Sequence, residues 1–487
     1  MSATRATGID MHEDVPAVRV GRGRWGTLAA VCLAQLVLML DVTVVIVALP
    51  SVAGYLGGSL SSLQLIIDGY ALTLAALLLN VGALADRIGH RRVFLAGLAW
   101  FGAASALCGA APSATLLVAA RALQGIAAAM LFSTGLAMLG AAYTGTDRAK
   151  ALGAFGAVFG AAVALGPLVG GAILEIGSWR WIFYANLPVI AVAIGITIRY
   201  ASESTDPNPR GLDLPGQVAF TVAIAALVTA LIKGPDWGWS SPVTLGLAAL
   251  AVISLGLFWA IETRSRAPMF DLGLLRNRTF TGAACAAFAT SASLFGMFVY
   301  LTAWFQRVQR LDGLHAGLRL LPVTIVAFVA AARSSSRISP RIVLALALSS
   351  STAGLLQMTT LAPTDQWTVI LPGLVLCGLG FGLANPTVAA VTLTVAPPDR
   401  AATAVGMNST FRQVGVASGV AALGAVFNTA LDRAGHATRV PLIGSHPLPG
   451  LQKVFTTGLG RVFVAGAAIA FLGALAAGTL VRRSPGD

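Results

Sequence analysis

Residues 25–50, WGTLAAVCLAQLVLMLDVTVVIVALP, decide the fold of this chain. They carry one charge, Asp41, and at about 1.5 Å per residue they are long enough to cross about 30 Å of hydrocarbon. The stretch is too long for a cleavable signal peptide, and a mixed acidic and basic stretch precedes it. We therefore expect it to remain as the first of several membrane spans.

Apolar runs of this kind recur along all 487 residues, of which 56% are hydrophobic and 10% charged. Such a composition excludes a conventional soluble enzyme, in which about a quarter of the residues are charged. Fourteen spans are predicted, at 26–50, 61–84, 92–111, 115–141, 150–175, 181–199, 216–233, 243–262, 279–304, 316–333, 341–361, 368–395, 402–431 and 460–481. The chain is therefore expected to be an all-α polytopic membrane protein.

The net charge of +13 reflects how the chain crosses the membrane. With the N-terminus in the cytoplasm, about 21 of the 32 basic residues fall in segments on the inner side, as the positive-inside rule requires. We therefore expect both termini in the cytoplasm of a cell whose plasma membrane the chain crosses. No basic stretch is interleaved with stacking aromatic residues, so no nucleic-acid partner is expected.

The spans divide the chain into five parts. We expect a cytoplasmic tail at 1–24, a six-helix bundle at 25–200, a connector with two inserted helices at 201–278, a second six-helix bundle at 279–482 and a short tail at 483–487. Parallel repeats of two helical bundles are typical of transporters, with a substrate cavity at their interface. The four cysteines lie in apolar runs without disulfide or metal spacing, and no metal site is predicted.

Charged residues inside spans are candidate functional groups, because the membrane excludes them unless they are paired, hydrated or protonated. Asp41 in the first span and Asp68 in the second are candidates for carrying protons or attracting a cation. Arg121 in the fourth span needs a partner, for which Asp41 and Asp68 are the candidates. A static buried ion pair is the structural alternative. Arg412 in the thirteenth span is a further candidate.

Glycine patterns mark two further segments. Gly156 and Gly160 in the fifth span, like Gly415 and Gly419 in the thirteenth, have a four-residue spacing that lets two helix backbones approach closely. Gly166 and Pro167 in LGPLVGG predict a kink and a close-packed surface in the fifth span.

Four motifs resemble those of the major facilitator superfamily, and specifically its fourteen-span drug:proton antiporter branch, over residues 25 to 482. The segment 82–92 resembles the loop after the second span, in which acidic and basic residues act in a conformational lock; the residues concerned are Gly82, Asp86, Arg87, Gly89, Arg91 and Arg92. Arg121 with Gln124 resembles the fourth-span motif whose arginine is associated with proton coupling. The glycines around Pro167, including Gly170 and Gly171, resemble the fifth-span motif of exporters, and Asp41 belongs to the first-span signature.

This chain departs from the family pattern at several positions. Ile46 stands where an asparagine is usual, Leu65 stands near the place of a tryptophan, and Ile190 replaces a common glycine. Ile46 removes a polar group from the presumed cavity. The loop of the second half, residues 334–343, lacks an acidic residue, so only the lock of the first half is expected to be intact.

The sequence thus predicts a monomeric, proton-driven exporter of small hydrophobic compounds that acts by alternating access and needs no cofactor. A proton-coupled importer of a metabolite is the alternative within transport, and a receptor or scaffold is the alternative from another class. A membrane-embedded enzyme is disfavoured because all five histidines fall in loops or the tail. ATP-driven transport is disfavoured because no phosphate-binding motif is present.

Overall fold

A computed structural model describes residues 22–57, 60–143, 145–205, 213–265, 268, 270–333, 338–396, 401–433 and 451–482, and none of these lies in a β-strand. The first seven helices are α1 (Arg22–Leu56), α2 (Leu60–Ile88), α3 (His90–Ala110), α4 (Ala114–Ala142), α5 (Gly145–Ile176), α6 (Trp181–Tyr184) and α7 (Asn186–Tyr200). The remainder are α8 (Leu214–Trp237), α9 (Pro242–Glu262), α10 (Leu272–Arg276), α11 (Arg278–Arg307), α12 (Gly313–Ala332), α13 (Pro340–Met358), the 3-10 turn η1 (Trp367–Ile370), α14 (Leu371–Val395), α15 (Ala401–Arg433) and α16 (Leu451–Leu480). The predicted all-α class is confirmed.

The predicted spans coincide with the long helices. Among the described residues, twelve helices are long and apolar enough to cross a membrane, with α6 and α7 counted together. A thirteenth is α2, whose two arms meet at 53°. The remaining predicted span, the fifth at 150–175, falls on α5, which has 32 residues. Hydropathy alone therefore predicted where each long helix of the chain lies.

One predicted boundary is wrong, and one predicted span contains a break. The segment between the second and third predicted spans, residues 85–91, expected as a loop, is helical except for Gly89, which turns the chain with a φ of 115°. Charged side chains at a helix end are solvated and do not stop the helix, whereas a glycine with positive φ does. The sixth span is broken at Ala185, since Pro188 has no N–H to donate to the carbonyl of Tyr184.

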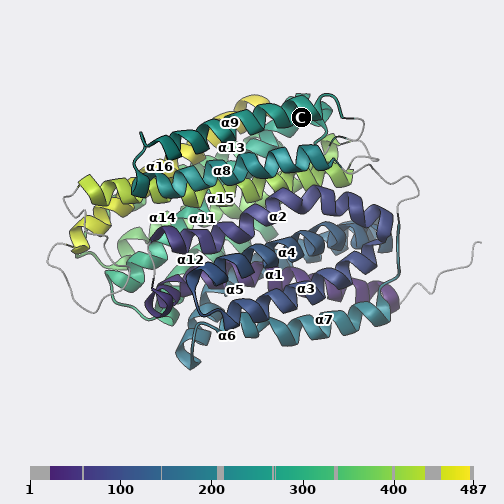
Figure 1. Cartoon of the computed structure of the whole chain (residues 1–487), viewed down its shortest axis with the longest axis horizontal. Helices are drawn as coiled ribbons and strands as arrows, with labels where there is room; N and C mark the ends of the chain where they lie inside the picture. Colours follow the sequence, from purple (N-terminus) through teal and green to yellow (C-terminus); the bar gives the residue numbers. More distant parts are fainter. Residues whose placement is uncertain are drawn as a thin grey trace, which may run out of the picture.

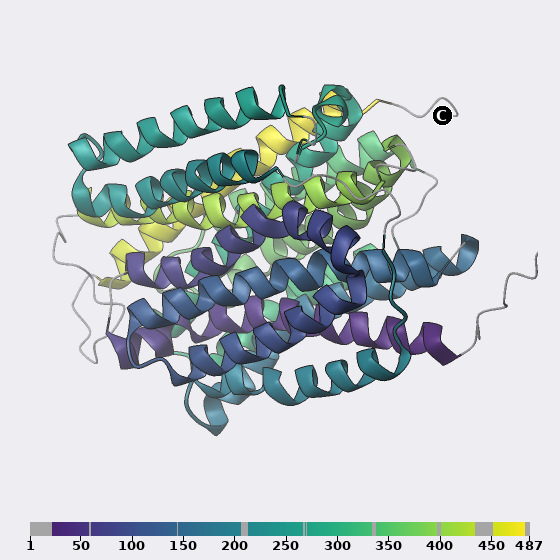
Figure 2. The same cartoon turned by 45° about the vertical axis from the view of Figure 1, so that its right-hand side comes forward.

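The helices form two groups and a pair on one side of the molecule (Figures 1 and 2). Helices α1 to α7 pack among themselves as the first bundle, and α11 to α16 pack among themselves as the second bundle. Helices α8 and α9 pack against each other, and α8 also contacts α2 and α15. We call this pair the insert.

The bundles meet along two seams, which we name after their helices: the α5–α12 seam and the α2–α15 seam. Helix α1 begins and α16 ends at the same end of the molecule, which is most plainly seen toward the right of Figure 2. We call it the terminal end. The first turns of α5, α8 and α11 lie there, because successive long helices run in opposite directions.

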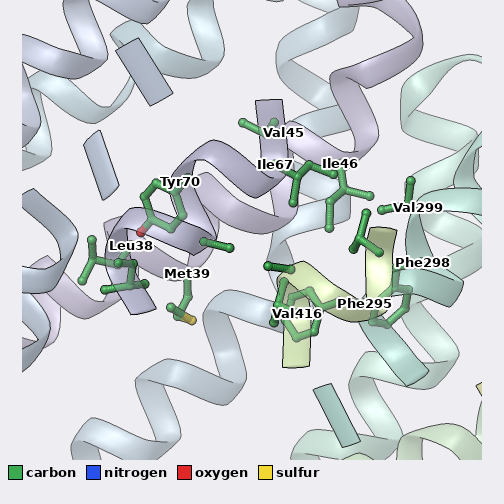
Figure 3. Close-up of a cluster of buried hydrophobic side chains, with 14 of the residues drawn as sticks. Leu38, Met39, Val45, Ile46, Ile67, Tyr70, Phe295, Phe298, Val299 and Val416 are labelled. Carbon is green, nitrogen blue, oxygen red and sulfur yellow. The ribbon is translucent and has the colours of Figure 1, made fainter. Parts of the chain in front are cut away.

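Apolar side chains fill the centre of the molecule between the bundles. Figure 3 shows Ile46 of α1 and Ile67 of α2 directed toward Phe298 and Val299 of α11, and all four belong to one buried cluster. The side chain at position 46, where the family usually has an asparagine, is thus part of an apolar contact between the bundles.

Candidate functional site

Five buried polar side chains from four helices of the first bundle form one hydrogen-bonded group, which we call the Asp41 cluster. Its members are Asp41 of α1, Ser105 of α3, Arg121 and Gln124 of α4, and Asn186 of α7. Asp41 is 2% exposed and Arg121 1%. Arg121 and Gln124 share one face of α4 because residues three apart on a helix are neighbours.

The Asp41 carboxylate accepts hydrogen bonds from three side chains. Arg121 Nη1 donates to Asp41 Oδ2. The amide nitrogens of Gln124 and Asn186 donate to Oδ1 over 3.0 and 3.1 Å. Both amides also donate to Ser105 Oγ, over 2.8 and 3.2 Å. Three donors therefore hold the Asp41 side chain in an interior where a carboxylate without partners would cost several kcal/mol.

Helix α2 completes the surroundings of the arginine. Arg121 Nε donates to the carbonyl of Ile66 over 3.2 Å, and its guanidinium carbon lies 4.4 Å from the centre of the Tyr70 ring. A cation over an aromatic face is stabilised by the ring quadrupole. Helix α2 comes this near because Gly125 has no side chain, and a Cβ there would collide with Thr73 and the Tyr70 carbonyl.

This geometry selects one partner for Arg121 from the two candidates, and it is Asp41. Asp68 of α2 is fully buried, yet neither of its carboxylate oxygens has a hydrogen-bond partner among the described residues. It lies outside the Asp41 cluster. Ser105 and Asn186 were not singled out from the sequence, since isolated neutral polar residues are common in membrane helices and carry no distinguishing pattern.

Arg412 is separate from this cluster. It lies on α15 and its guanidinium carbon is 5.6 Å from the centre of the Phe132 ring on α4, so it crosses from the second bundle to the first. Arg412 thus lies at the boundary between the two bundles.

The turn between α2 and α3 holds the predicted lock residues. Asp86 Oδ1 lies 3.0 Å from His90 Nε2. Arg91 donates through its backbone N–H to Glu203 over 2.9 Å and through Nη2 to the carbonyl of Ile198 over 2.8 Å. Arg92 lies 3.7 Å from Glu203. The partner of Asp86 in this conformation is thus a histidine, and Glu203 is a member of the site that sequence reasoning missed.

The remaining residues of the predicted lock are Gly82, Gly89 and Arg87. Gly82 faces α4, where a Cβ would come within 3.7 Å of Ser133. Gly89 lies against the carboxylate of Glu203, which a Cβ would approach to 2.6 Å at its carbon. Arg87 is exposed in the last turn of α2.

The glycines of α5 bring two neighbouring helices close. A Cβ at Gly166 would collide with the Thr43 side chain of α1, and one at Gly170 would come within 3.1 Å of Val44. On the other side, a Cβ at Gly171 would lie 2.6 Å from the carbonyl oxygen of Gly313 on α12. Pro167 lies within α5, and its carbonyl meets α12 at Gly317.

The expected close approach at Gly156 is wrong. A Cβ there would meet no heavy atom within 4 Å, and the residue is exposed. The surroundings of Gly160 lie outside the described residues. In α15, by contrast, Gly415 and Gly419 do allow the predicted contact, since a Cβ at either would collide with the backbone of α11 at Phe288 or Ala292.

This contrast supplies a first prediction. Replacing Gly171 by valine should lower the free energy of unfolding by about 1–3 kcal/mol, because the added atoms overpack the contact between α5 and α12. Gly156→Val is the matched control in the same helix and should leave it almost unchanged. Thermal denaturation in detergent measures both. Equal melting temperatures for the two variants would show that α5 does not pack as described.

The fold and this cluster define a class of membrane transporter. Residues 31–420 match the family model of the Major Facilitator Superfamily, and the chain belongs to that family. It is 38% identical over 427 residues to the puromycin resistance protein pur8 of Streptomyces alboniger, covering 85% of this chain and 84% of that protein. It is 36% identical over 397 residues to the methylenomycin A resistance protein of Streptomyces coelicolor, with coverages of 81% and 83%.

A third relative is the multidrug resistance protein Stp of Mycobacterium tuberculosis, 34% identical over 404 residues, with 82% of this chain and 75% of that protein covered. Among solved structures, a bacterial homologue of the human lysosomal transporter Spinster, inward-facing and unoccupied, has a TM-score of 0.64 at 16% identity over 95% of this chain and 99% of that one. The structure is similar in fold alone; the sequence relatives support the predicted drug:proton antiporter branch.

Proposed function

We propose that this chain is a proton-coupled exporter of small hydrophobic organic compounds such as drugs, antibiotics or a natural product of its own cell. One observation carries the proposal: a fully buried carboxylate, Asp41, is paired with a fully buried arginine in the first bundle. The relatives named for antibiotic and multidrug resistance support the same conclusion.

We propose that protonation of Asp41 couples the entry of protons to the export of substrate. The ionised acid holds Arg121, Gln124 and Asn186. A proton on Asp41 removes the negative charge and turns one of its acceptors into a donor. Arg121 then needs other partners, and the resulting free-energy difference shifts the balance between the two arrangements of the bundles.

The remaining predicted residues receive supporting roles in this proposal. Asp68 is a second carboxyl able to carry a proton, since an ionised acid without a donor is costly at its depth. Arg412 senses the relative position of the bundles. The glycines and charged residues at the α2–α3 turn act in the conformational lock. The glycines around Pro167 form the surface on which the two bundles move against each other.

We also propose the arrangement in the cell. The bundles and insert take the limits predicted from the sequence, the terminal end faces the cytoplasm because most arginines lie there, and the chain acts as a monomer in the plasma membrane. The central contact around Ile46 and Phe298 is apolar, which suits a hydrophobic substrate better than a sugar or a carboxylate.

Drug accumulation in a bacterial host that lacks its own efflux pumps tests this function. Cells that express the chain should accumulate less puromycin, or less of another lipophilic antibiotic, than cells with the empty vector. Cells that express Asp41→Asn at the same level should accumulate as much as the vector control. If the wild type changes the accumulation of no compound in a panel of lipophilic and charged antibiotics, the proposal is wrong.

A further inference from the structure

We infer that Gln217, in the first turn of the insert, is a positioning residue for the conformational lock. Its amide holds the bend of α2 and so sets the direction of the arm that carries Asp86 and Arg87. The inference rests on the lock that the proposed function includes, and it adds the part of the chain that orients this lock.

Helix α2 is bent at a place where its own sequence offers no cause. Its two arms, Leu65–Leu78 and Val81–Ile88, meet at 53°. We call Val81–Ile88 the lock arm, because it carries the lock residues of α2. The helix has no proline, no glycine–serine pair near the bend and no π-turn. The remaining common cause of so sharp a bend is a side chain that enters the ladder of backbone hydrogen bonds.

Gln217 of α8 provides such a side chain. Its Nε2 donates to the carbonyl of Ala76, two residues before the first arm ends at Leu78. In an α-helix this carbonyl accepts from the N–H four residues later, at position 80, which lies between the two arms. Gln217 is buried, so little water competes for the bond. It therefore offers an external donor to a carbonyl whose partner within the helix lies in the bend itself.

The first turn of α8 directs the amide of Gln217 toward α2. Asp213 caps the helix, and its side chain accepts from the backbone N–H of Gly216 over 2.9 Å. Gln217 Nε2 also donates to Thr221 Oγ1 over 3.0 Å, one turn further along α8. Helix α8 itself packs against α2 and α15 (Figure 1). Because the side chain is already held by its own helix, the bond to Ala76 orders little that is not ordered before.

The stretch of chain that leads to α8 also holds the far end of the lock arm. His90 donates its backbone N–H to the carbonyl of Ser204 over 3.0 Å, and Arg91 donates its backbone N–H to Glu203 over 2.9 Å. These two acceptors lie after α7, in the connector between the first bundle and the insert. The chain from the connector to the first turn of α8 therefore bonds at both ends of the lock arm, at the α2–α3 turn and, through Gln217, at the bend.

An aromatic group fixes the insert to the second bundle. The ring of Phe270 lies 5.5 Å from those of Phe220 on α8 and Phe258 on α9, measured between centres. It lies 5.9 Å from the ring of Phe411 on α15. Pairs at such separations are stabilised beyond the burial of their area. When the second bundle moves relative to the first, the insert follows it, and Gln217 passes the movement to the bend of α2.

Electron–electron resonance distances in the full chain test the inference. Spin labels on unnatural amino acids, which leave the native cysteines in place, are put at Ile88 and at one of two reference sites, Trp25 or Leu116. All three side chains are exposed. The lock arm is about 12 Å long, so straightening a bend of 53° moves its end by about 10 Å. At least one of the two distances should therefore change by more than about 3 Å when the bend is released.

The variant that releases the bend is Gln217→Met, which keeps the length of the side chain and removes its donor. The matched control is Thr221→Val, which removes the other acceptor of the same amide and leaves the bond to Ala76. Gln217→Met should shift the distances, and Thr221→Val should keep those of the wild type. If Gln217→Met does not fold, Gln217→Asn replaces it, since its amide is one carbon too short to reach the carbonyl. Wild-type distances in the Gln217 variant would overturn the inference.

Stability and transport separate positioning from a merely structural role. Each variant loses one hydrogen bond, so Gln217→Met and Thr221→Val should have similar melting temperatures in detergent. Uptake driven by a pH gradient in inverted vesicles should be about fivefold slower in Gln217→Met, a change that one lost hydrogen bond allows, and unchanged in Thr221→Val. Equal uptake by the two variants would contradict the inference even if export itself is established. Shifted distances in a protein whose wild type exports nothing would instead locate the failure in the proposed function.

Discussion

Asp41→Asn is expected to abolish substrate uptake driven by a pH gradient in inverted vesicles, lowering the initial rate by more than about tenfold. Asparagine has nearly the shape of aspartate and keeps an oxygen that can accept from Arg121, so the change removes the titratable group with little change of shape, while it leaves the buried Arg121 without its anion. Because a carboxamide cannot bind and release a proton at physiological pH, the proton gradient can no longer bias the two conformations.

The design of this experiment separates coupling from binding. Substrate exchange down its own concentration gradient, without a pH gradient, should persist in Asp41→Asn because the bundles can still rock. Ser105→Ala offers a matched comparison, since it removes the hydroxyl that accepts from Gln124 and Asn186 without changing any charge, and it should keep uptake driven by the pH gradient. If Asp41→Asn vesicles transport at the wild-type rate at all pH values, the role of Asp41 in coupling is wrong.

Arg121→Leu should destabilise the protein strongly, by about 3–5 kcal/mol, because it leaves the buried carboxylate of Asp41 without its cation. Leucine also removes the contact with the Tyr70 ring and the hydrogen bond to the Ile66 carbonyl. The apparent melting temperature in detergent, followed by tryptophan fluorescence, measures the loss.

The double variant Asp41→Asn with Arg121→Leu is the decisive comparison. If the two residues form the pair described, removing both charges leaves no uncompensated ion, and the double variant should be more stable than Arg121→Leu alone. Stability losses that simply add would show that the two side chains do not interact in the folded protein.

Hydropathy predicted where the helices lie but not where they end. In α2, the charges at Asp86 and Arg87 suggested a loop, yet the helix continues to Ile88 because a helix that leaves the hydrocarbon keeps its own hydrogen bonds in water. Only the positive φ of Gly89 stops it. Hydropathy shows where the chain leaves the membrane, and the helix can continue beyond that point.

The site was partly predictable for a related reason. An unpaired acid and an unpaired arginine are both costly at membrane depth, so the pairing of Asp41 with Arg121 was among the expected outcomes. Ser105 and Asn186 are neutral, and nothing in their local sequence indicates that each one bonds to side chains of two other helices. Gly156 shows the converse: a small-residue spacing predicts that two helices can approach, but only the path of the neighbouring helix decides whether they do.

The central claim, that Asp41 carries the proton whose movement is coupled to export, is tested most directly by proton release when substrate binds. Adding an exported antibiotic to purified protein in unbuffered detergent solution, with a pH-sensitive dye, should release protons from the wild type. Asp41→Asn should bind the antibiotic and release none. Equal proton release from both proteins at the same occupancy would contradict the account.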